Sequence, residues 1–316
     1  MSLVITDLRK WFGEVRALDG VSFSVPPGTV FGFLGGNGAG KTTTMRIMLD
    51  ILRADSGSVT WNGVASTELP RRTWGYLPEE RGLYPRMTVL EQLLYFASLY
   101  RVPADRARRD ADAWLERFRI PQHRDRRVEE LSKGNQQKIQ FLAAILHDPE
   151  VLVMDEPFSG LDPVNAAMLR AAFLEMRDRG KTLVFSTHEL ATVEELCDAV
   201  AIVDRGHVVA NGPTREVRRM RGRRVVRLGV TGDPALPWLS IPDALVRRPG
   251  HDATEIDVGP AVDPSEVLGQ ALAHGETVTR FETADPTLEQ VFIDLVGHDP
   301  AAEERTLASL ASPAEG

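Results

Sequence analysis

Short apolar runs alternate with helical patterns along the first two thirds of the chain. Runs typical of buried strands occur at residues 29–34, 151–156 and 183–185. Apolar residues at helical spacing follow at 44–49 and recur within 86–130. Strand and helix patterns then alternate again through the middle of the chain, which predicts an α/β fold with a parallel sheet.

Capping residues locate the starts of several predicted helices. Thr88, with Glu91 three residues later, predicts a capping box at the start of the helical region. Asp263 and Asp285 are each followed by proline, which predicts helices with aspartate at the N-cap and proline at the first helical position. These helices belong to a mixed pattern at residues 222–297, where we expect a small α+β accessory domain.

Composition and charge limit the class of protein. Hydrophobic residues make up 43% and charged residues 26% of the chain, which is typical of globular proteins. The formal net charge of −8 argues against a broad basic face, so no nucleic-acid partner is expected. The single cysteine, Cys197, excludes an internal disulfide framework. A cytosolic protein is expected, because no apolar run approaches the ~20 residues of a spanning helix and no signal-peptide pattern is present.

Two segments near the C-terminus have unusual composition. Arginines crowd residues 215–227, where Glu216 is the one acidic residue. Contact with anionic lipid or with an acidic partner surface is one interpretation, and a solvated linker helix is the favoured one. Residues 298–316, rich in Ala, Glu, Ser and Pro, are expected to be disordered.

A glycine-rich turn lies between a predicted strand and a predicted helix. It fits the phosphate-loop pattern G-x-x-x-x-G-K-[ST] without a mismatch. The candidate nucleotide-binding residues are therefore Gly35, Gly36, Asn37, Gly38, Ala39, Gly40, Lys41, Thr42 and Thr43. Glycines let the backbone wrap a phosphate closely, and the amides at the start of the helix donate hydrogen bonds to it. Lys41 would reach the β- and γ-phosphates of a nucleoside triphosphate, and the Thr42 hydroxyl would hold Mg²⁺.

The run at 151–156 ends in two carboxylates, Asp155 and Glu156. A buried parallel strand can deliver such acids to a metal site, with Asp155 binding Mg²⁺ and Glu156 acting as general base toward water. A core strand followed by a solvated acidic turn is the alternative.

A second candidate anion site begins at Ser132. This serine is the predicted N-cap of a helix, and Gly134 leaves the backbone amides of the first turn open. An ordinary capped helix is the alternative for a serine and a glycine at this spacing.

In the order of its motifs, the chain resembles the ATP-binding subunits of ABC transporters. The motifs are the phosphate loop at 35–43, the signature-like segment 131–135, the acidic strand at 151–156, and segments 159–162 and 186–188. The resemblance covers residues 2–220 and implies an ABC-type ATP-binding domain with a phosphate-loop NTPase core. It also implies that residues at about 86–130 form the helical subdomain of that family.

The resemblance assigns roles that the residues alone do not. His188 would contact the γ-phosphate and support Glu156, which together with Lys41 gives the expected catalytic set. Phe12 matches the aromatic residue that stacks on adenine, and Trp11 is its rival. A loop that crosses a dimer interface would consist of Ser159, Gly160, Leu161 and Asp162. Contacts to ATP from a second subunit would come from Ser132, Gly134 and Asn135.

Three motifs depart from the family pattern, at four positions. The signature usually reads Leu-Ser-Gly-Gly-Gln, and here Lys133 and Asn135 replace its third and fifth residues. Gly36 stands where proline is common. Glu79 replaces the usual glutamine, and its carboxylate can bind Mg²⁺ but cannot donate a hydrogen bond. The segment around Glu79 resembles a subgroup of ABC-2-type exporters that includes sodium and drug exporters.

The resemblance therefore implies an ATPase with ATP and Mg²⁺ as its ligands. Two ATP molecules would join a head-to-tail pair, formed with a second copy or with a homologous subunit. The partner would be a membrane-spanning permease, reached from the cytoplasmic face of the membrane, and transport would be export. A soluble ABC-type ATPase acting on ribosomes or DNA, and a regulatory subunit that binds ATP without hydrolysis, are the alternatives.

Overall fold

The structure, a computed structural model, describes residues 2–80, 82–250 and 252–297. These residues form two compact units, an N-terminal unit that ends at residue 212 and a C-terminal unit that begins at residue 213. The segment 298–316, for which the sequence predicts disorder, lies outside the described residues.

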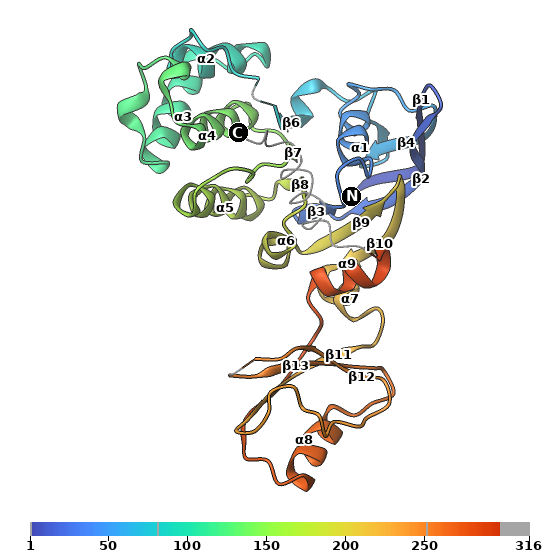
Figure 1. Cartoon of the computed structure of the whole chain (residues 1–316). Helices are drawn as coiled ribbons and strands as arrows, with labels where there is room; N and C mark the ends of the chain where they lie inside the picture. The colour runs from blue at the N-terminus through green and yellow to red at the C-terminus, as the bar shows by residue number, and fades with distance from the viewer. Residues whose placement is uncertain (1, 81, 251, 298–316) are drawn as a thin grey trace, which may run out of the picture. The chain divides into compact units, whose positions relative to one another are not determined.

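Within the described part of the N-terminal unit, six strands form a sheet in the order β10–β9–β3–β8–β7–β6 (Figure 1). Their bounds are β3 Val30–Leu34, β6 Trp74–Leu77, β7 Val151–Asp155, β8 Thr182–Thr187, β9 Ala199–Asp204 and β10 His207–Pro213. Strand β3 pairs in parallel with β8 and β9, and β7 pairs in parallel with β6 and β8. Strands β3, β7 and β8 are buried throughout, as in a parallel sheet covered on both faces. The predicted α/β fold is confirmed.

The carboxyl ends of these parallel strands lie in register at one edge of the sheet. Leu34 of β3 pairs with Thr187 of β8, and Asp155 of β7 pairs with Ser186 of β8. The loops that follow these strands therefore leave the sheet at the same edge. In open α/β sheets, ligands bind at this edge.

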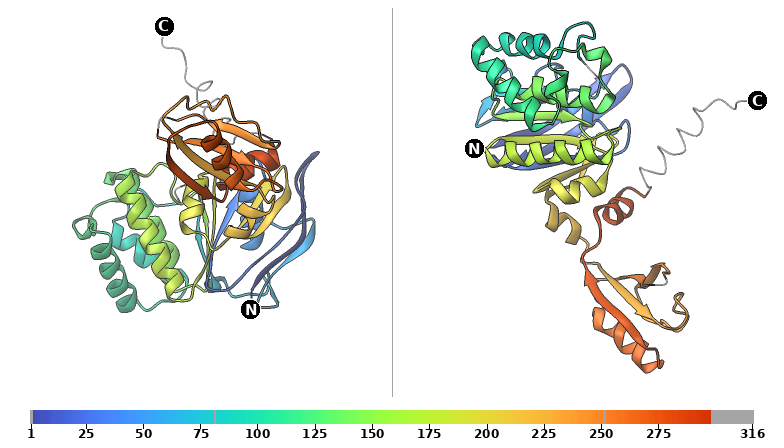
Figure 2. Two further views of the ribbon diagram at one scale, coloured as in Figure 1. Left: turned by 90° about the horizontal axis from the view of Figure 1, so that it is seen from below. Right: turned by 90° about the vertical axis from the view of Figure 1, so that its left-hand side faces the viewer.

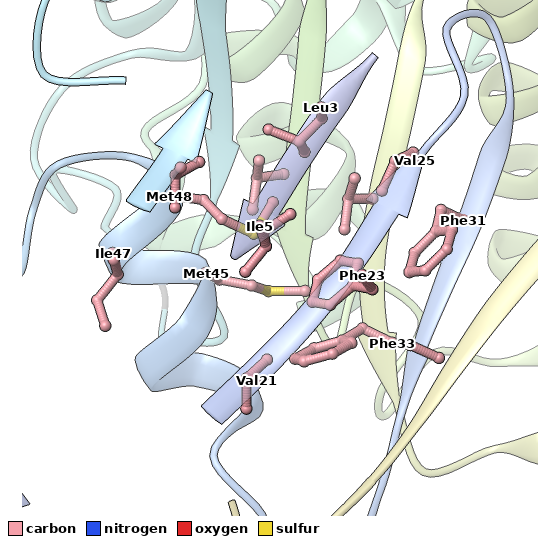
Figure 3. Packing of buried hydrophobic residues seen from close by; sticks show 14 of the residues in the cluster. Leu3, Ile5, Val21, Phe23, Val25, Phe31, Phe33, Met45, Ile47 and Met48 are labelled. Carbon is pink, nitrogen blue, oxygen red and sulfur yellow. The ribbon is translucent and has the colours of Figure 1, made fainter. Parts of the chain in front are cut away.

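A second, antiparallel sheet packs beside the first. It has the order β2–β1–β4–β5, with β1 Leu3–Phe12, β2 Val15–Val25, β4 Ser56–Trp61 and β5 Val64–Ala65. One buried apolar cluster joins the two sheets and helix α1 (Lys41–Met48), as Figure 3 shows. Phe23 of β2 stacks on Phe31 of β3 with ring centroids 5.3 Å apart, and Met45 of α1 belongs to the same cluster. This packing fixes the start of α1 against the end of β3.

Helices supply the remaining part of the N-terminal unit. Helix α2 (Val89–Leu99) packs against α3 (Ala104–Arg117) and α4 (Lys133–Ile145), and α5 (Pro163–Asp178) and α6 (Leu190–Leu196) follow. The predicted capping box at the start of α2 is confirmed, because Thr88 and Glu91 exchange backbone-to-side-chain hydrogen bonds. No helix in the described part of the chain is long and apolar enough to cross a bilayer.

The C-terminal unit is an antiparallel sheet with helices. The sheet has the order β12–β13–β11–β14, with bounds Ala244–Arg248, Thr254–Val258, Arg224–Val230 and Val278–Ala284 in that order. Helix α8 (Pro264–Ala273) covers one face of this sheet (Figure 2), and α7 (Thr214–Arg219) and α9 (Leu288–Val296) lie at the two ends of the unit in sequence. Val267 and Ala271 of α8 are buried against Val226 and Leu228 of β11.

One of the two predicted aspartate caps in this unit is confirmed and the other is wrong. Asp263 caps α8, with proline at its first position. Helix α9 instead begins after Thr287, which forms a capping box with Gln290. The Asp285 carboxylate forms an ion pair with Arg219 at 2.7 Å, so it does not cap this helix.

The favoured interpretation of the arginine-rich segment, a solvated linker helix, holds only in part, because the segment starts in the short helix α7 and continues into strand β11. Helix α7 ends at Arg219 and strand β11 begins at Arg224, inside the C-terminal unit. Arg218 donates to the backbone carbonyl of Pro286 at 2.7 Å, and Arg223 donates to Asp257 at 2.8 Å. Arg218 therefore joins the two ends of the unit in sequence, and Arg223 pairs with strand β13.

Candidate functional site

The phosphate loop connects β3 to α1 and requires glycine at two positions. Gly40, the N-cap of α1, has a φ of 103°, and a Cβ there would lie 2.8 Å from a neighbouring backbone oxygen. A Cβ on Gly35 would lie 2.4 Å from the carbonyl oxygen of Val203. Lys41 Nζ donates to the carbonyl oxygens of Gly35 at 2.8 Å and Gly36 at 3.1 Å. The lysine side chain therefore folds back over the loop.

A pocket of about 360 Å³ opens beside this loop. It is lined by Phe12, Ala17, Asn37, Gly38, Ala39, Gly40, Lys41, Thr42, Thr43, Glu79, Asp155 and Glu156. Trp11 does not line it, and the Trp11 ring instead lies 5.5 Å from the guanidinium of Arg16. Of the two aromatic candidates, the structure brings Phe12, which is 50% exposed, to the phosphate loop.

The acidic end of β7 is organised by a serine of the neighbouring strand. Asp155 is buried, and its Oδ1 accepts a hydrogen bond from the hydroxyl of Ser186. The same Ser186 oxygen accepts the backbone N–H of Glu156 at 3.1 Å. Glu156 has a φ of 46°, a left-handed conformation that is uncommon for non-glycine residues and marks a constrained turn. Ser186 thus holds the positions of both acids.

His188 lies next to Glu156 at the same edge of the sheet. It follows the end of β8, and its Nδ1 is 3.1 Å from Oε1 of Glu156. Both side chains are largely shielded from solvent, with relative exposures of 23% for His188 and 10% for Glu156. The predicted pairing of these two residues is therefore present as a direct contact.

Glu79, in the loop after β6, brings a third carboxylate into the pocket. Partial burial and the negative charges of Asp155 and Glu156 raise the pKa of Glu79, and the charge of Lys41 lowers it. A cation beside these acids would favour their charged forms.

The residues present fit a Mg²⁺ ion. Oδ2 of Asp155 is buried and has no hydrogen-bond partner among the described residues, while Oδ1 is held by Ser186. Thr42 and Glu79 line the same pocket as Asp155. No group of three or more His, Cys, Asp or Glu in the described part of the chain could hold a metal alone. This agrees with Mg²⁺, which is usually bound by one or two carboxylates together with phosphates and water.

Comparison with known proteins assigns the site to a family. Residues 18–159 match the ABC transporter family, and residues 212–296 match the C-terminal domain of DrrA1-3-like ATP-binding proteins. The uncharacterized ABC transporter ATP-binding protein YhaQ of Bacillus subtilis is 40% identical over 296 residues, which is 93% of this chain and 98% of YhaQ. The chain belongs to the ATP-binding proteins of ABC transporters. As a member of this family it binds and hydrolyses ATP.

Two further similarities extend this result. Nod factor export ATP-binding protein I of Ralstonia nicotianae is 33% identical over 302 residues, which is 94% of each chain. A solved ATP-binding cassette of an ABC transporter in its ADP conformation has a TM-score of 0.62 and 28% identity, and covers 68% of this chain and 92% of its own. The resemblance to ABC transporter ATP-binding subunits, including the exporter subgroup, is confirmed.

The signature segment of this ABC protein lies away from the pocket. Ser132 caps α4 by accepting the N–H of Asn135 at 3.4 Å, as predicted, and neither residue lines the pocket beside the phosphate loop. Gly134 allows close approach to α5, since a Cβ there would lie 2.6 Å from Nδ2 of Asn165. The structure therefore brings together the candidates at the strand ends but not those of the signature segment.

The candidate interface loop at 159–162 leads into α5. Gly160 has a φ of 67°, and Asp162 caps α5 by accepting the N–H groups of Val164 and Asn165 at 3.0 Å. Asn165 also donates to the carboxylate of Asp162. Asn165 therefore bonds to this loop and also lies close to Gly134 of the signature helix.

Proposed function

We propose that this ABC protein powers export through a separate membrane permease, and that Glu156 and His188 carry out its ATP hydrolysis. The contact of 3.1 Å between Glu156 Oε1 and His188 Nδ1, beside the pocket lined by Lys41 and Thr42, carries the catalytic part of this proposal. This contact supports the assignment of Glu156 as general base with His188 as its polar partner.

The proposed chemistry uses these residues in distinct roles. Glu156 accepts a proton from the water that attacks the γ-phosphorus in line with the leaving β-phosphate oxygen. Lys41 and the amides at the start of α1 stabilise the negative charge on the phosphates. Thr42, Glu79 and Asp155 would hold Mg²⁺, which would supply positive charge against the negative charge that develops on the phosphates. His188 orients Glu156 and contacts the γ-phosphate.

The position of the signature segment supports a dimer. Ser132, Gly134 and Asn135 lie at the start of α4, outside the pocket that holds the other candidates. In a head-to-tail pair, these residues of a second copy or a homologous subunit would cap the γ-phosphate with their amides and hydroxyl. Residues 159–162 would cross the interface.

Export is supported by the relatives and by the C-terminal unit. A relative that matches 94% of this chain is a Nod factor export protein, and residues 212–296 match a DrrA1-3-like domain. An ATP-binding subunit that couples to a permease works at the cytoplasmic face of the membrane, which is where we propose this chain acts.

Affinity purification of the Glu156→Gln variant from detergent-solubilised membranes tests the transport proposal. Slow hydrolysis should preserve the ATP-bound complex, so a multi-span membrane protein should be recovered and identified by mass spectrometry. Lys41→Ala, which weakens nucleotide binding, is the matched control and should recover less of it. Recovery of ribosomal or DNA-associated proteins alone would instead support a soluble ABC-type ATPase and overturn the export proposal.

A further inference from the structure

Helix α4 contacts both acidic loops of the pocket through two glutamines. Gln137 and Gln140 are three residues apart and therefore lie on the same face of the helix. Both are buried, with exposures of 7% and 4%. Gln137 Nε2 donates to the carbonyl oxygen of Pro157 at 3.0 Å. Gln140 Nε2 donates to the carbonyl oxygens of Pro78 at 2.9 Å and Glu80 at 3.2 Å.

The accepting carbonyls are adjacent to the proposed functional acids. Pro157 directly follows Glu156, and Pro78 and Glu80 are the two neighbours of Glu79 in the chain. One amide group of Gln140 thus fixes the backbone on both sides of Glu79. Glu79 is only partly covered by its neighbours and keeps substantial solvent exposure, so packing alone does not determine where its carboxylate lies.

We propose that Gln140 is a positioning residue for Glu79 and Gln137 is one for Glu156. Helix α4, which begins at the signature residue Ser132, then connects the segment expected to contact a second subunit with both acids. Gln140 lies eight residues after Ser132, about 12 Å along the helix axis at the rise of an α-helix. This inference rests on the proposed function, because it concerns the roles assigned there to Glu79 and Glu156.

The chemistry of Gln140 indicates that this residue holds the backbone beside Glu79 and does not merely fill space in the core. An amide NH₂ group has two N–H donors and so can bond two carbonyls at once, and the amide oxygen of Gln140 has no partner among the described residues. A buried polar atom without a partner is unfavourable, so an apolar side chain of similar size would suit a purely structural position better. Methionine, with similar length and helix propensity, is such a side chain.

The test compares three glutamine-to-methionine variants of this one helix in the full chain. Gln140→Met removes the two bonds around Glu79, and Gln137→Met removes the bond after Glu156. Gln136→Met is the matched control, because Gln136 donates to the carbonyls of Val128 and Leu131, at 3.1 Å each, away from both acids. Thermal unfolding of each variant confirms that it is folded.

Hydrogen exchange measured by mass spectrometry gives a readout that does not depend on activity. Gln140→Met should accelerate exchange in the peptide containing Glu79, and Gln137→Met should do so in the peptide containing Glu156. Gln136→Met should accelerate neither. Equal exchange in these peptides for all three variants and the unmodified chain would overturn the inference.

Kinetics then test whether Gln140 acts through Glu79. Gln140→Met should raise the Mg²⁺ concentration that gives half-maximal ATPase activity by roughly 10–100-fold, as for other groups that orient metal ligands. In a Glu79→Ala background, the same substitution should have no further effect on this concentration. Additive effects of the two substitutions would overturn the positioning role.

The two proposals fail in different ways. In one outcome, the unmodified chain hydrolyses ATP and the Glu156→Gln variant does not, but Gln140→Met and Gln136→Met have the same hydrogen exchange near Glu79 and the same Mg²⁺ dependence. The proposed function then stands and the positioning role is wrong. If Glu156→Gln hydrolyses ATP at the unmodified rate while exchange still rises near Glu79, the loop contact stands and the proposed catalytic roles are wrong.

Discussion

The Ser186 hydroxyl donates a hydrogen bond to Oδ1 of Asp155, across neighbouring strands where these two residues pair directly. Both residues are buried at the carboxyl edge of the sheet. One Asp155 oxygen is therefore held by the protein, and the other, which has no hydrogen-bond partner among the described residues, is the one we propose for the cation. The same serine oxygen accepts the N–H of Glu156, so one side chain positions the acids with two different proposed roles.

Ser186→Ala should lower the rate of ATP hydrolysis. The substitution frees the carboxylate of Asp155 and leaves the amide of Glu156 without its acceptor, and losses of roughly 10–100-fold are usual for such supporting groups. Steady-state ATPase assays at several Mg²⁺ concentrations measure the effect. Ser98→Ala, which removes an exposed serine hydroxyl of α2, is the control and should behave as the unmodified chain. A Ser186→Ala enzyme with unchanged kinetics would contradict this role.

Glu156→Gln should nearly abolish turnover while preserving ATP binding. Glutamine keeps the shape of the side chain and a polar contact to His188, but it cannot accept the proton from water; general-base catalysis contributes roughly 10²–10⁴-fold. We expect an ATP-dependent dimer to accumulate, which size-exclusion chromatography with light scattering would detect. ADP should not produce the dimer. Rapid hydrolysis by this variant would show that Glu156 is not the base.

The parts of the site that the sequence predicts are those encoded locally. The phosphate loop is recognisable because glycines at fixed spacing follow an apolar run, and a Cβ at Gly35 or Gly40 would collide with backbone. Asp155 and Glu156 are recognisable because they end a buried strand. Parallel strands then bring these segments to one edge without any further signal.

The parts that the sequence does not predict depend on contacts between distant residues. Asp285 precedes a proline and looks like a helix cap, but it pairs with Arg219, which is 66 residues away. Ser186 is visible only as part of a motif, because its role depends on its register with Asp155 in the sheet. The bonds of Gln140 span 60 residues or more, so no local pattern reveals them.

Glu79→Gln should stabilise the protein at neutral pH in the absence of nucleotide and Mg²⁺. The pKa of Glu79 is raised in the folded state by partial burial and by the charges of Asp155 and Glu156, so the folded chain holds this proton more tightly than the unfolded chain. The contribution of Glu79 to the free energy of unfolding is therefore fully present below its ordinary pKa of 4.5. It is lost as the pH rises through the higher pKa that Glu79 has in the folded chain. Glutamine does not ionise and avoids this loss.

Thermal unfolding at pH 7 and at pH 4 measures this effect. The Glu79→Gln variant should have a higher Tm than the unmodified chain at pH 7 and a nearly equal Tm at pH 4, where the carboxyl group is mostly protonated in both states. An equal shift at the two pH values would show that the substitution acts through packing and not through ionisation.

Asp257→Ala should destabilise the C-terminal unit. Asp257 is 4% exposed and accepts hydrogen bonds from Arg223 at 2.8 Å and from Arg247 at 2.6 Å. Its removal leaves two guanidinium groups without their shared partner. We expect a loss of about 2 kcal/mol in the free energy of unfolding. Removing one partner of a fully buried ion pair costs about 3–5 kcal/mol, and the loss here is smaller because both arginines are partly exposed. Urea unfolding of the full chain, followed by hydrogen exchange in peptides from residues 213–297, measures it.

Asp243 offers a matched control for this prediction, since it pairs with the same Arg223 at 3.0 Å but is 52% exposed. Asp243 has a left-handed backbone with a φ of 61°, which asparagine tolerates better than alanine. Water screens an exposed pair and solvates the arginine when the charge is lost, so Asp243→Asn should cost less than about 1 kcal/mol. Equal losses for the two aspartates would mean that burial does not determine the strength of these pairs.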